Sequence, residues 1–251
     1  MIFRSKKVYL LLLAVFLFLI LPGCSVLKTA LYHDYDIKKY ENVSDDKEYI
    51  VVFHGVYGKF EDMKIIAESL NKDGYNVISI QYPTNTDSVE DITEKYIKPA
   101  LDGIDKDRKV NFIVHSMGSG VLRYYLKNNE VKNLGKVVFL SPPSHGSALS
   151  DNPISSMLKD PLGKAVSQFS MKKGSFVNEL GNPDYPCYVM IGNKSNNPVY
   201  SAMIPGKDDG MVPLDGSKLD TCDYKIIEKT THTSILKDDR TISEIKKYLN
   251  N

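Results

Sequence analysis

The sequence lacks an excess of either charge. Its 32 lysines and arginines are balanced by 31 aspartates and glutamates, which leaves a formal net charge of +1. It also lacks the block of lysine and arginine with interleaved aromatic residues that is typical of nucleic-acid binding. We therefore expect no nucleic-acid partner. No internal repeat or low-complexity tract is present, and the length of 251 residues suits a single domain.

The sequence also lacks the patterns that hold metals and common cofactors. No cluster of cysteine, histidine and carboxylate residues has metal-ligand spacing. There is no phosphate-binding loop and no nicotinamide-binding glycine fingerprint. We therefore expect no cofactor and no metal, so that any chemistry has to come from ordinary side chains.

Cysteine is scarce, and the first of the three cysteines ends a distinctive segment. Residues 1–7 are basic, Val8–Leu21 is an apolar run typical of a signal sequence, and Leu21-Pro22-Gly23-Cys24 follows. This resembles a bacterial lipobox, in which the cysteine is lipidated and becomes the mature N-terminus. We predict a lipoprotein signal peptide over 1–24 and a membrane-anchored domain that faces outside the cytoplasm, extracellular or periplasmic. In the alternative, an ordinary cleaved signal or an uncleaved anchor, Cys24 has no role.

From Tyr49 onward the sequence alternates between apolar, β-branched runs and helical periodicity. Residues 25–48 are polar, and we predict a tether there, with or without a short helix. Strands alternating with helices indicate an α/β fold, with a mostly parallel sheet of about six strands and helices on both faces, in one domain over 49–251. The predicted strands are 49–53, 75–80, 110–114, 136–140, 185–191 and 224–228, and the predicted helices are 60–72, 88–104, 121–127 and 241–249.

One stretch, residues 110–120, carries the strongest local signal. Its apolar start predicts a buried strand, and it passes through His115-Ser116-Met117-Gly118 into a helix. A sharp strand-to-helix turn of small residues holds a serine in a strained backbone conformation, so that its hydroxyl projects above the sheet. The N-terminus of the following helix offers free N–H groups to an anion. Ser116 is therefore the candidate nucleophile.

A serine needs a base and an acid beside it to act as a nucleophile. The segment 206–213 follows the fifth predicted strand, and its Asp-Gly turn presents Asp209 before a proline-fixed exit. We assign Asp209 as the catalytic acid, with Asp208 as the alternative. Of the five histidines only His232 follows Asp209, directly after the sixth predicted strand, and it is the candidate base. The order Ser116, Asp209, His232 is one that serine hydrolases use.

The negative charge that develops on a carbonyl oxygen during attack is stabilised by N–H donors, and two are expected. We assign one donor to the backbone of Met117, which follows the nucleophile. The other is the backbone of Val56, in the turn after the first predicted strand. Gly55 lets the backbone approach closely there, and Gly58 leaves the loop uncrowded. These two N–H groups form the predicted oxyanion hole.

Together these stretches resemble the bacterial α/β-hydrolases of the lipase/esterase superfamily, near the compact lipases and the lipase-like relatives of the GPI-inositol deacylase. A further stretch is similar to the Pro-x-His-Gly-Ser loop that these lipases carry after the strand following the nucleophile. The stretches that carry the resemblance are residues 53–56, 114–118, 140–147 and 209–213 together with His232.

The resemblance implies an α/β-hydrolase fold and a carboxylic ester hydrolase, with an acyl-enzyme at Ser116 and an ester or lipid as substrate. The sequence departs from the family's Gly-x-Ser-x-Gly motif at Val114, which stands where the first glycine is expected. His145 is interpreted as a residue that shapes its loop, with direct substrate contact as the alternative.

Two further features accompany these motifs. Residues 149–180 have no counterpart in the resemblance and form a possible lid or small helical insertion, whose apolar residues could line an acyl groove or simply pack on the domain. Cys187 lies near the amino end of the fifth predicted strand, and Cys222 lies just before the sixth. If these strands are parallel neighbours outside the cytoplasm, a disulfide between the two cysteines is feasible.

More than one activity is compatible with these residues. The same triad could hydrolyse oxygen esters, hydrolyse thioesters or transfer an acyl group. A catalytically inactive hydrolase-fold lipoprotein that binds a lipid or a partner is a further alternative. The ordered set of Ser116, Asp209 and His232 favours an enzyme, because a binding module has no use for all three. The acyl length, the alcohol and the oligomeric state are open at this point.

Overall fold

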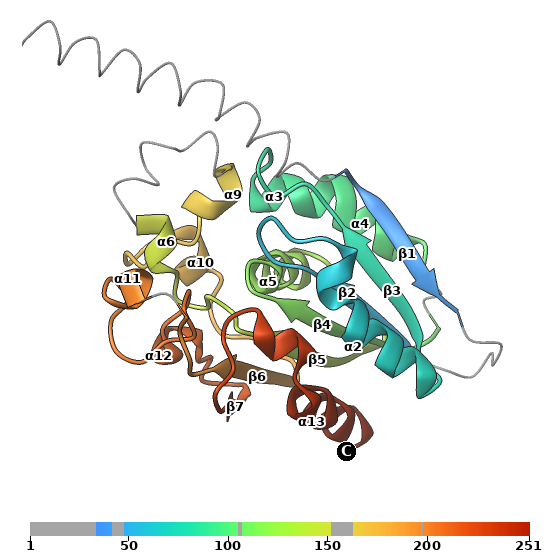
Figure 1. Ribbon diagram of the computed structural model, residues 1–251. Helices are drawn as coiled ribbons and strands as arrows, with labels where there is room; N and C mark the ends of the chain where they lie inside the picture. Colours follow the sequence, from blue (N-terminus) through green and yellow to red (C-terminus); the bar gives the residue numbers. More distant parts are fainter. Residues whose placement is uncertain (1–33, 42–47, 105–106, 152–162, 197) are drawn as a thin grey trace, which may run out of the picture. The chain divides into compact units, whose positions relative to one another are not determined.

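A seven-stranded, mostly parallel sheet forms the centre of the described structure (Figure 1). The computed structural model describes residues 34–41, 48–104, 107–151, 163–196 and 198–251. The strand order is β1-β3-β2-β4-β5-β6-β7, in which β1 runs antiparallel to β3 and the other neighbouring pairs are parallel. The strands are β1 (Asp36–Tyr40), β2 (Tyr49–Phe53), β3 (Asn76–Gln81), β4 (Val110–His115), β5 (Leu134–Leu140), β6 (Cys187–Gly192) and β7 (Asp223–Ile227).

Helices follow most of the strands, as the alternating pattern predicts. The predicted helix over 88–104 is a continuous segment that contains a π-helical turn, η1, between two short α-helices. Among the described residues, no helix is long and apolar enough to span a membrane. The helices are α2 (Phe60–Lys72), α3 (Val89–Ile92), η1 (Thr93–Ile97), α4 (Lys98–Asp102), α5 (Gly118–Asn128), α6 (Ala148–Asp151), α9 (Lys164–Ser167), α10 (Phe176–Glu179), α11 (Pro198–Ser201), α12 (Leu214–Ser217), the 3₁₀-helix η2 (Ser234–Lys237) and α13 (Asp239–Asn250).

Strand β1 lies in the segment 25–48, for which the polar composition predicts a tether. Its residues 36–40 instead form a strand at the sheet edge, paired with β3, and with it the predicted sheet of about six strands has seven. The fold therefore begins before residue 49. Residues 1–33, with the predicted signal peptide and Cys24, and residues 42–47 lie outside the described residues.

Each face of the sheet packs against its own layer of helices, because consecutive residues of a strand point to opposite faces. On β2, Val51 and Phe53 belong to the core shared with α3, η1, α4 and α5. Ile50 and Val52 of the same strand belong to the core shared with α2, η2 and α13. Figure 1 shows α2 and α13 on one side of the sheet and α5 on the other. The predicted arrangement, with helices on both faces, is confirmed.

A disulfide joins the ends of two neighbouring strands. Cys187 is the first residue of β6, and Cys222 directly precedes β7. Because β6 and β7 are parallel neighbours, both cysteines lie at the amino ends of their strands. Their sulfurs are bonded, with the two Cα atoms 4.7 Å apart. The disulfide that the sequence made feasible is thus present, at the end of the sheet away from the candidate site.

Candidate active site

Ser116 lies in the turn that joins β4 to α5, at the carboxyl end of the central strand. Its φ angle is 51°, in the left-handed region that non-glycine residues rarely occupy. Such a conformation costs roughly 1–3 kcal/mol and persists only where the surroundings hold it. Here the Ser116 N–H donates to the Leu140 carbonyl at 2.9 Å, and the Ser116 carbonyl accepts from both the N–H and the hydroxyl of Ser119. The strained serine turn expected from the sequence is therefore formed.

Glycine is required in this turn and in the neighbouring turn after β2, because nearby atoms leave no room for a side chain at either position. A Cβ on Gly118 would lie 2.7 Å from the His54 carbonyl oxygen, and a Cβ on Gly55 would lie 2.8 Å from the Cβ of Ser116. Val114, which replaces the first glycine of the motif, is accommodated in the core between β2 and β5, opposite Phe53 and Phe139. The departure from the motif therefore leaves the turn intact.

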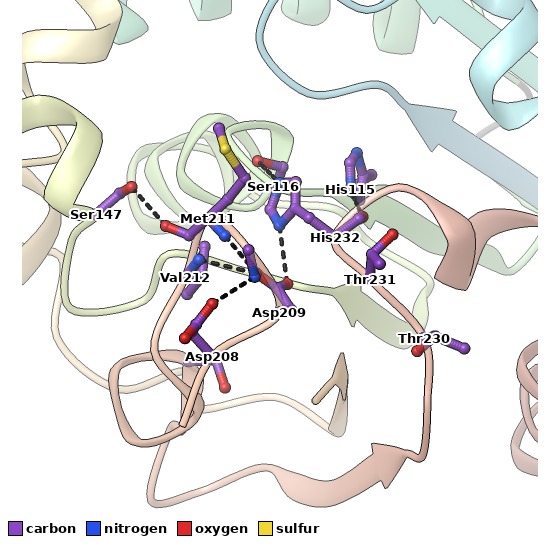
Figure 2. A network of polar contacts seen from close by, with 12 residues as sticks. His115, Ser116, Ser147, Asp208, Asp209, Met211, Val212, Thr230, Thr231 and His232 are labelled. Carbon is purple, nitrogen blue, oxygen red and sulfur yellow. Dashed lines mark hydrogen bonds and ion pairs between the residues drawn. The ribbon is translucent and has the colours of Figure 1, made fainter. Parts of the chain in front are cut away.

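Three side chains from separate loops form one hydrogen-bonded chain (Figure 2). The Nε2 atom of His232 lies 2.8 Å from the hydroxyl oxygen of Ser116, and its Nδ1 atom lies 2.9 Å from a carboxylate oxygen of Asp209. Ser116 follows β4, Asp209 lies in the loop after β6, and His232 follows β7. All three are buried, with exposed fractions of 6 %, 0 % and 7 % for Ser116, Asp209 and His232. The structure brings together all three residues of the predicted triad.

The second carboxylate oxygen of Asp209 is held by its own loop. It accepts hydrogen bonds from the backbone N–H groups of Met211 at 3.0 Å and Val212 at 2.9 Å. Burial opposes ionisation of Asp209, but the neighbouring His232 and the hydrogen bonds outweigh it and hold the pKa of the carboxyl below its usual range. The His232 N–H also donates to the Asp209 carbonyl at 2.8 Å, which ties the two loops together.

Asp208, the alternative acid, makes its hydrogen bonds to residues other than His232. One of its carboxylate oxygens accepts from the Ser201 hydroxyl at 2.9 Å and from the Gly210 N–H at 2.7 Å. Of the two adjacent aspartates, Asp209 alone is hydrogen-bonded to His232. The structure therefore favours Asp209 for the position of the acid.

His115 makes a contact that the sequence analysis did not anticipate. Its Nε2 atom lies 2.8 Å from the backbone carbonyl of His232, so that it must carry the proton and donate there. Burial, followed by the nearby His232, lowers the pKa of His115 from its ordinary 6.5 to about 3. His115 is thus a neutral donor that holds the backbone of the candidate base. No sequence signal marks this role, because the residue before the serine is variable in the motif.

Two other histidines have structural contacts. His54 is buried, accepts at Nε2 from the Tyr82 N–H at 3.2 Å and lies 2.8 Å from the Gly55 carbonyl through Nδ1. His145 is exposed, and its Nδ1 atom lies 3.1 Å from the side-chain oxygen of Asn178. His145 thus links its loop to α10, which agrees with the loop-shaping interpretation.

The residues of the predicted oxyanion hole lie beside Ser116. Val56 and Met117 line the same small cavity as Ser116 and His232. Among the described residues we find no hydrogen-bond acceptor for the backbone N–H of Val56 or of Met117. The next residue, Tyr57, has a φ of 55°, and its N–H donates to the Thr84 hydroxyl at 2.9 Å, which fixes the turn. Both amides are therefore available to an oxygen at the serine.

The comparisons with known proteins address the fold. No protein-family model matches the sequence, and no curated protein matches it. Among solved structures, the chain is similar to the mature lipase BlEst2 from Bacillus licheniformis, with a TM-score of 0.66 and 20 % identity over 85 % of this chain and 98 % of that one. It is also similar to MGS-MChE2, an α/β-hydrolase enzyme from the metagenome of lagoon sediments at Mar Chica, Morocco, with a TM-score of 0.57 and 16 % identity over 87 % and 94 %. The chain has the α/β-hydrolase fold.

The α/β-hydrolase fold by itself leaves the reaction open. A bromoperoxidase from Bacillus anthracis is similar to the chain as well, with a TM-score of 0.61 and 12 % identity over 86 % of this chain and 95 % of that one. One fold can carry unrelated activities, because the activity depends on the residues of the site. At the site, no group of histidine, cysteine and carboxylate side chains among the described residues is arranged to hold a metal ion.

The possible lid over residues 149–180 is described in part. Its described residues include α9 and α10, and Val166 and Phe169 line the small cavity beside Ser116. Residues 152–162 of the segment lie outside the described residues. The described part of the segment thus borders the cavity beside Ser116. That the segment moves as a lid stays a prediction.

Proposed function

We propose that the protein is a serine hydrolase that cleaves carboxylic esters through an acyl-enzyme at Ser116. The observation that carries this proposal is the buried chain of hydrogen bonds from Ser116 through His232 to Asp209. It begins at a serine held in a strained turn and ends at a carboxylate whose pKa is lowered. A protein that only binds a lipid or a partner has no need of this arrangement.

In the proposed reaction, the Ser116 oxygen attacks the ester carbonyl carbon while Nε2 of His232 removes the hydroxyl proton. Asp209 accepts a hydrogen bond from Nδ1 and stabilises the positive charge on the ring. When the tetrahedral intermediate collapses, the carbon–oxygen bond to the alcohol breaks and His232 gives the proton to the departing oxygen. A water molecule, activated by the same histidine, then hydrolyses the acyl-enzyme and releases the acid.

The backbone N–H groups of Val56 and Met117 stabilise the oxyanion in this scheme. Met117 directly precedes the first turn of α5, so the positive end of the helix dipole adds to its N–H. A donor of this kind contributes about 2.7–4 kcal/mol to transition-state stabilisation. Thioester hydrolysis and acyl transfer use the same residues and differ in the leaving group or the acceptor, so they are close variants of the proposal.

Membrane anchoring is a second part of the proposal. It is supported by the sequence alone, through the basic start, the apolar run and the Leu21-Pro22-Gly23-Cys24 stretch. We propose that Cys24 carries the lipid and that the hydrolase domain faces outside the cytoplasm. The substrate is then an ester or lipid at the cell surface.

Replacement of the serine tests the proposed activity. Ser116→Ala should lower kcat for p-nitrophenyl butyrate by roughly 10⁴-fold or more, because the nucleophile is absent. The melting temperature should stay within a few degrees of that of the parent protein. Ester hydrolysis near the parent rate in a folded Ser116→Ala protein would rule out Ser116 as the nucleophile.

A further inference from the structure

Ser141 directly follows β5, which lies in the sheet between the strand before the nucleophile and the strand before the acid. Ser116 follows β4 on one side, and Asp209 lies in the loop after β6 on the other. The Ser141 N–H donates to the Met190 carbonyl of β6 at 2.7 Å. The carbonyl of the preceding residue, Leu140, accepts from the Ser116 N–H at 2.9 Å. The backbone at Ser141 is therefore tied to both sides of the candidate site.

The backbone of Ser141 is strained. Its φ angle is 47°, in the left-handed region that non-glycine residues rarely occupy. A residue before a proline favours extended backbone, and Pro142 follows, which makes this angle more unusual still. Such a conformation persists only where the surroundings hold it, and it is typical of active sites. In this respect Ser141 is like the candidate nucleophile Ser116, whose φ angle is 51°.

The hydroxyl of Ser141 is buried and has no hydrogen-bond partner. The exposed fraction of the residue is 0 %. Within the described part of the chain, no group completes a hydrogen bond of standard geometry with its Oγ atom. Ser144 of the same loop is equally buried, but its hydroxyl donates to the Ser217 carbonyl at 2.8 Å. A buried hydroxyl without a partner destabilises the folded protein, so stability does not account for a serine at position 141.

The Asp209 carboxylate is the acceptor beside this hydroxyl. Burial raises the pKa of Asp209, and the charge and ring N–H of His232, the Val212 N–H and the Ser141 hydroxyl lower it. An ionised carboxylate only accepts hydrogen bonds, so the hydroxyl faces it as a donor. One carboxylate oxygen accepts from two backbone N–H groups, whereas the oxygen that faces His232 accepts from Nδ1 alone. That second oxygen can take one further donor.

We propose that Ser141 is a positioning residue that donates its hydroxyl to the Asp209 carboxylate while the ring of His232 is charged. Hydrogen bonds between catalytic groups are often long or poorly aligned without substrate and tighten in the transition state. The completed bond keeps the carboxylate in line with Nδ1 when the ring takes the proton of Ser116. The strained backbone keeps the hydroxyl at the place where this bond forms. The inference rests on the proposed ester hydrolysis and adds a fourth side chain to its machinery.

Replacement by glycine tests the proposal, because glycine adopts a positive φ readily and removes only the hydroxymethyl group. In Ser141→Gly, kcat for p-nitrophenyl butyrate should fall about tenfold and KM should stay within about twofold, since a hydrogen bond to a charged group is lost. A carboxylate that has lost a donor holds the proton on His232 more strongly. The apparent pKa of the acid limb of kcat/KM should therefore rise by about 0.5. An unchanged kcat and pH profile in the folded variant would overturn the proposal.

Ser144→Ala is the matched control. It removes a buried hydroxyl from the same loop, but that hydroxyl is bonded to Ser217 and not to the acid. We expect its melting temperature to fall further than that of Ser141→Gly, because a formed hydrogen bond is lost. Its kcat should stay within about twofold of the parent value, with the same pH profile. The reverse pattern, in which Ser141→Gly loses stability but keeps its kcat, would show that Ser141 is only structural.

A double-mutant cycle tests whether Ser141 acts through Asp209. The tenfold loss expected for Ser141→Gly in the parent should shrink to less than about twofold in the Asp209→Asn background, where the carboxylate is gone. A tenfold loss in both backgrounds would mean that Ser141 acts independently of the acid, and would overturn the proposal. Absence of ester hydrolysis in the parent itself would contradict the proposed function and this inference with it.

Discussion

At the scale of single residues, backbone strain gathers around the site. Ser116 and Tyr57, which adjoins the proposed donor Val56, both have positive φ angles although neither is glycine. Such conformations persist only where the surrounding structure holds them, and they cluster at active sites. Hydrogen bonds to Leu140 and Thr84 hold the two turns. The strain keeps the serine oxygen and the Val56 amide in place before any substrate binds.

The adjacent aspartates offer a matched pair of substitutions. Asp209→Asn should lower kcat by roughly 10³–10⁴-fold, because an amide cannot stabilise the charged ring of His232 or fix its tautomer. Asp208→Asn is the control, since the side-chain oxygen of asparagine can still accept from Ser201 and Gly210. Its kcat should stay within about threefold of that of the parent. Equal losses in both variants would speak against Asp209 as the acid.

The buried His115 predicts a specific dependence of stability on pH. Its folded-state pKa of about 3 lies below its ordinary 6.5, so the unfolded chain binds a proton there that the folded chain does not. The stability is fully present above pH 6.5 and is lost as pH falls toward 3. In His115→Gln this loss is absent, while an amide N–H can still donate to the His232 carbonyl.

Urea unfolding at pH 6 and at pH 4.5 checks this expectation. The parent should lose about 2 kcal/mol more of its unfolding free energy over this interval than His115→Gln loses. Contributions from the other histidines are common to both proteins and cancel in the comparison. Identical losses would mean that His115 takes up a proton in the folded protein.

At the site, the sequence predicted the three residues of the triad but not every contact between the loops that carry them. Ser116, Asp209 and His232 could be found because a motif, a turn and the chain order each mark one of them. The bond from His115 to the His232 carbonyl joins residues 117 positions apart, and no local pattern contains that information. Contacts of this kind depend on the packing of loops, which the sequence does not display.

At the scale of helices and strands, the elements with a clear apolar pattern are the ones whose bounds the sequence predicts correctly. The bounds of β2 and α2 match the predicted 49–53 and 60–72, because both elements have buried residues at regular spacing. Strand β1 has no such pattern, because three of its five residues are charged and exposed and no apolar run marks it. Charged edge strands protect a sheet from pairing with other chains. The same property hides them in the sequence.

The disulfide gives a prediction at this scale. It links residues 35 positions apart, and closing a loop of that length in the unfolded chain should stabilise the fold by about 3–4 kcal/mol. The double variant Cys187→Ala, Cys222→Ala should lose this amount in urea unfolding. Reductant should lower the stability of the parent by a similar amount and should leave the double variant unchanged. A parent that is insensitive to reductant under denaturing conditions would contradict the bond.

At the scale of the whole molecule, the sheet gathers the site at one end. The candidate residues follow β2, β4, β6 and β7, so their side chains meet at the carboxyl ends of parallel strands, where ligands bind in open α/β sheets. The disulfide lies at the other end. A lipase and a bromoperoxidase share this architecture with the chain. The substrate depends on the loops, which differ between such proteins.

The proposed anchor is a property of the full chain. When the protein is produced in bacteria fed an alkyne-bearing fatty acid, the parent should become labelled and Cys24→Ala should not, because Cys24 is the proposed site of lipidation. Cys187→Ala is the control and should be labelled like the parent. Labelling of Cys24→Ala at the parent level would contradict the lipoprotein prediction.

The central claim is that Ser116 is an activated nucleophile. The most direct measurement is reaction of the folded protein with a fluorophosphonate, followed by mass spectrometry of the modified peptide. The account predicts one adduct, on Ser116, which is lost in His232→Ala although that variant remains folded. An adduct on another residue, or no adduct on the folded protein either with or without detergent, would contradict the claim.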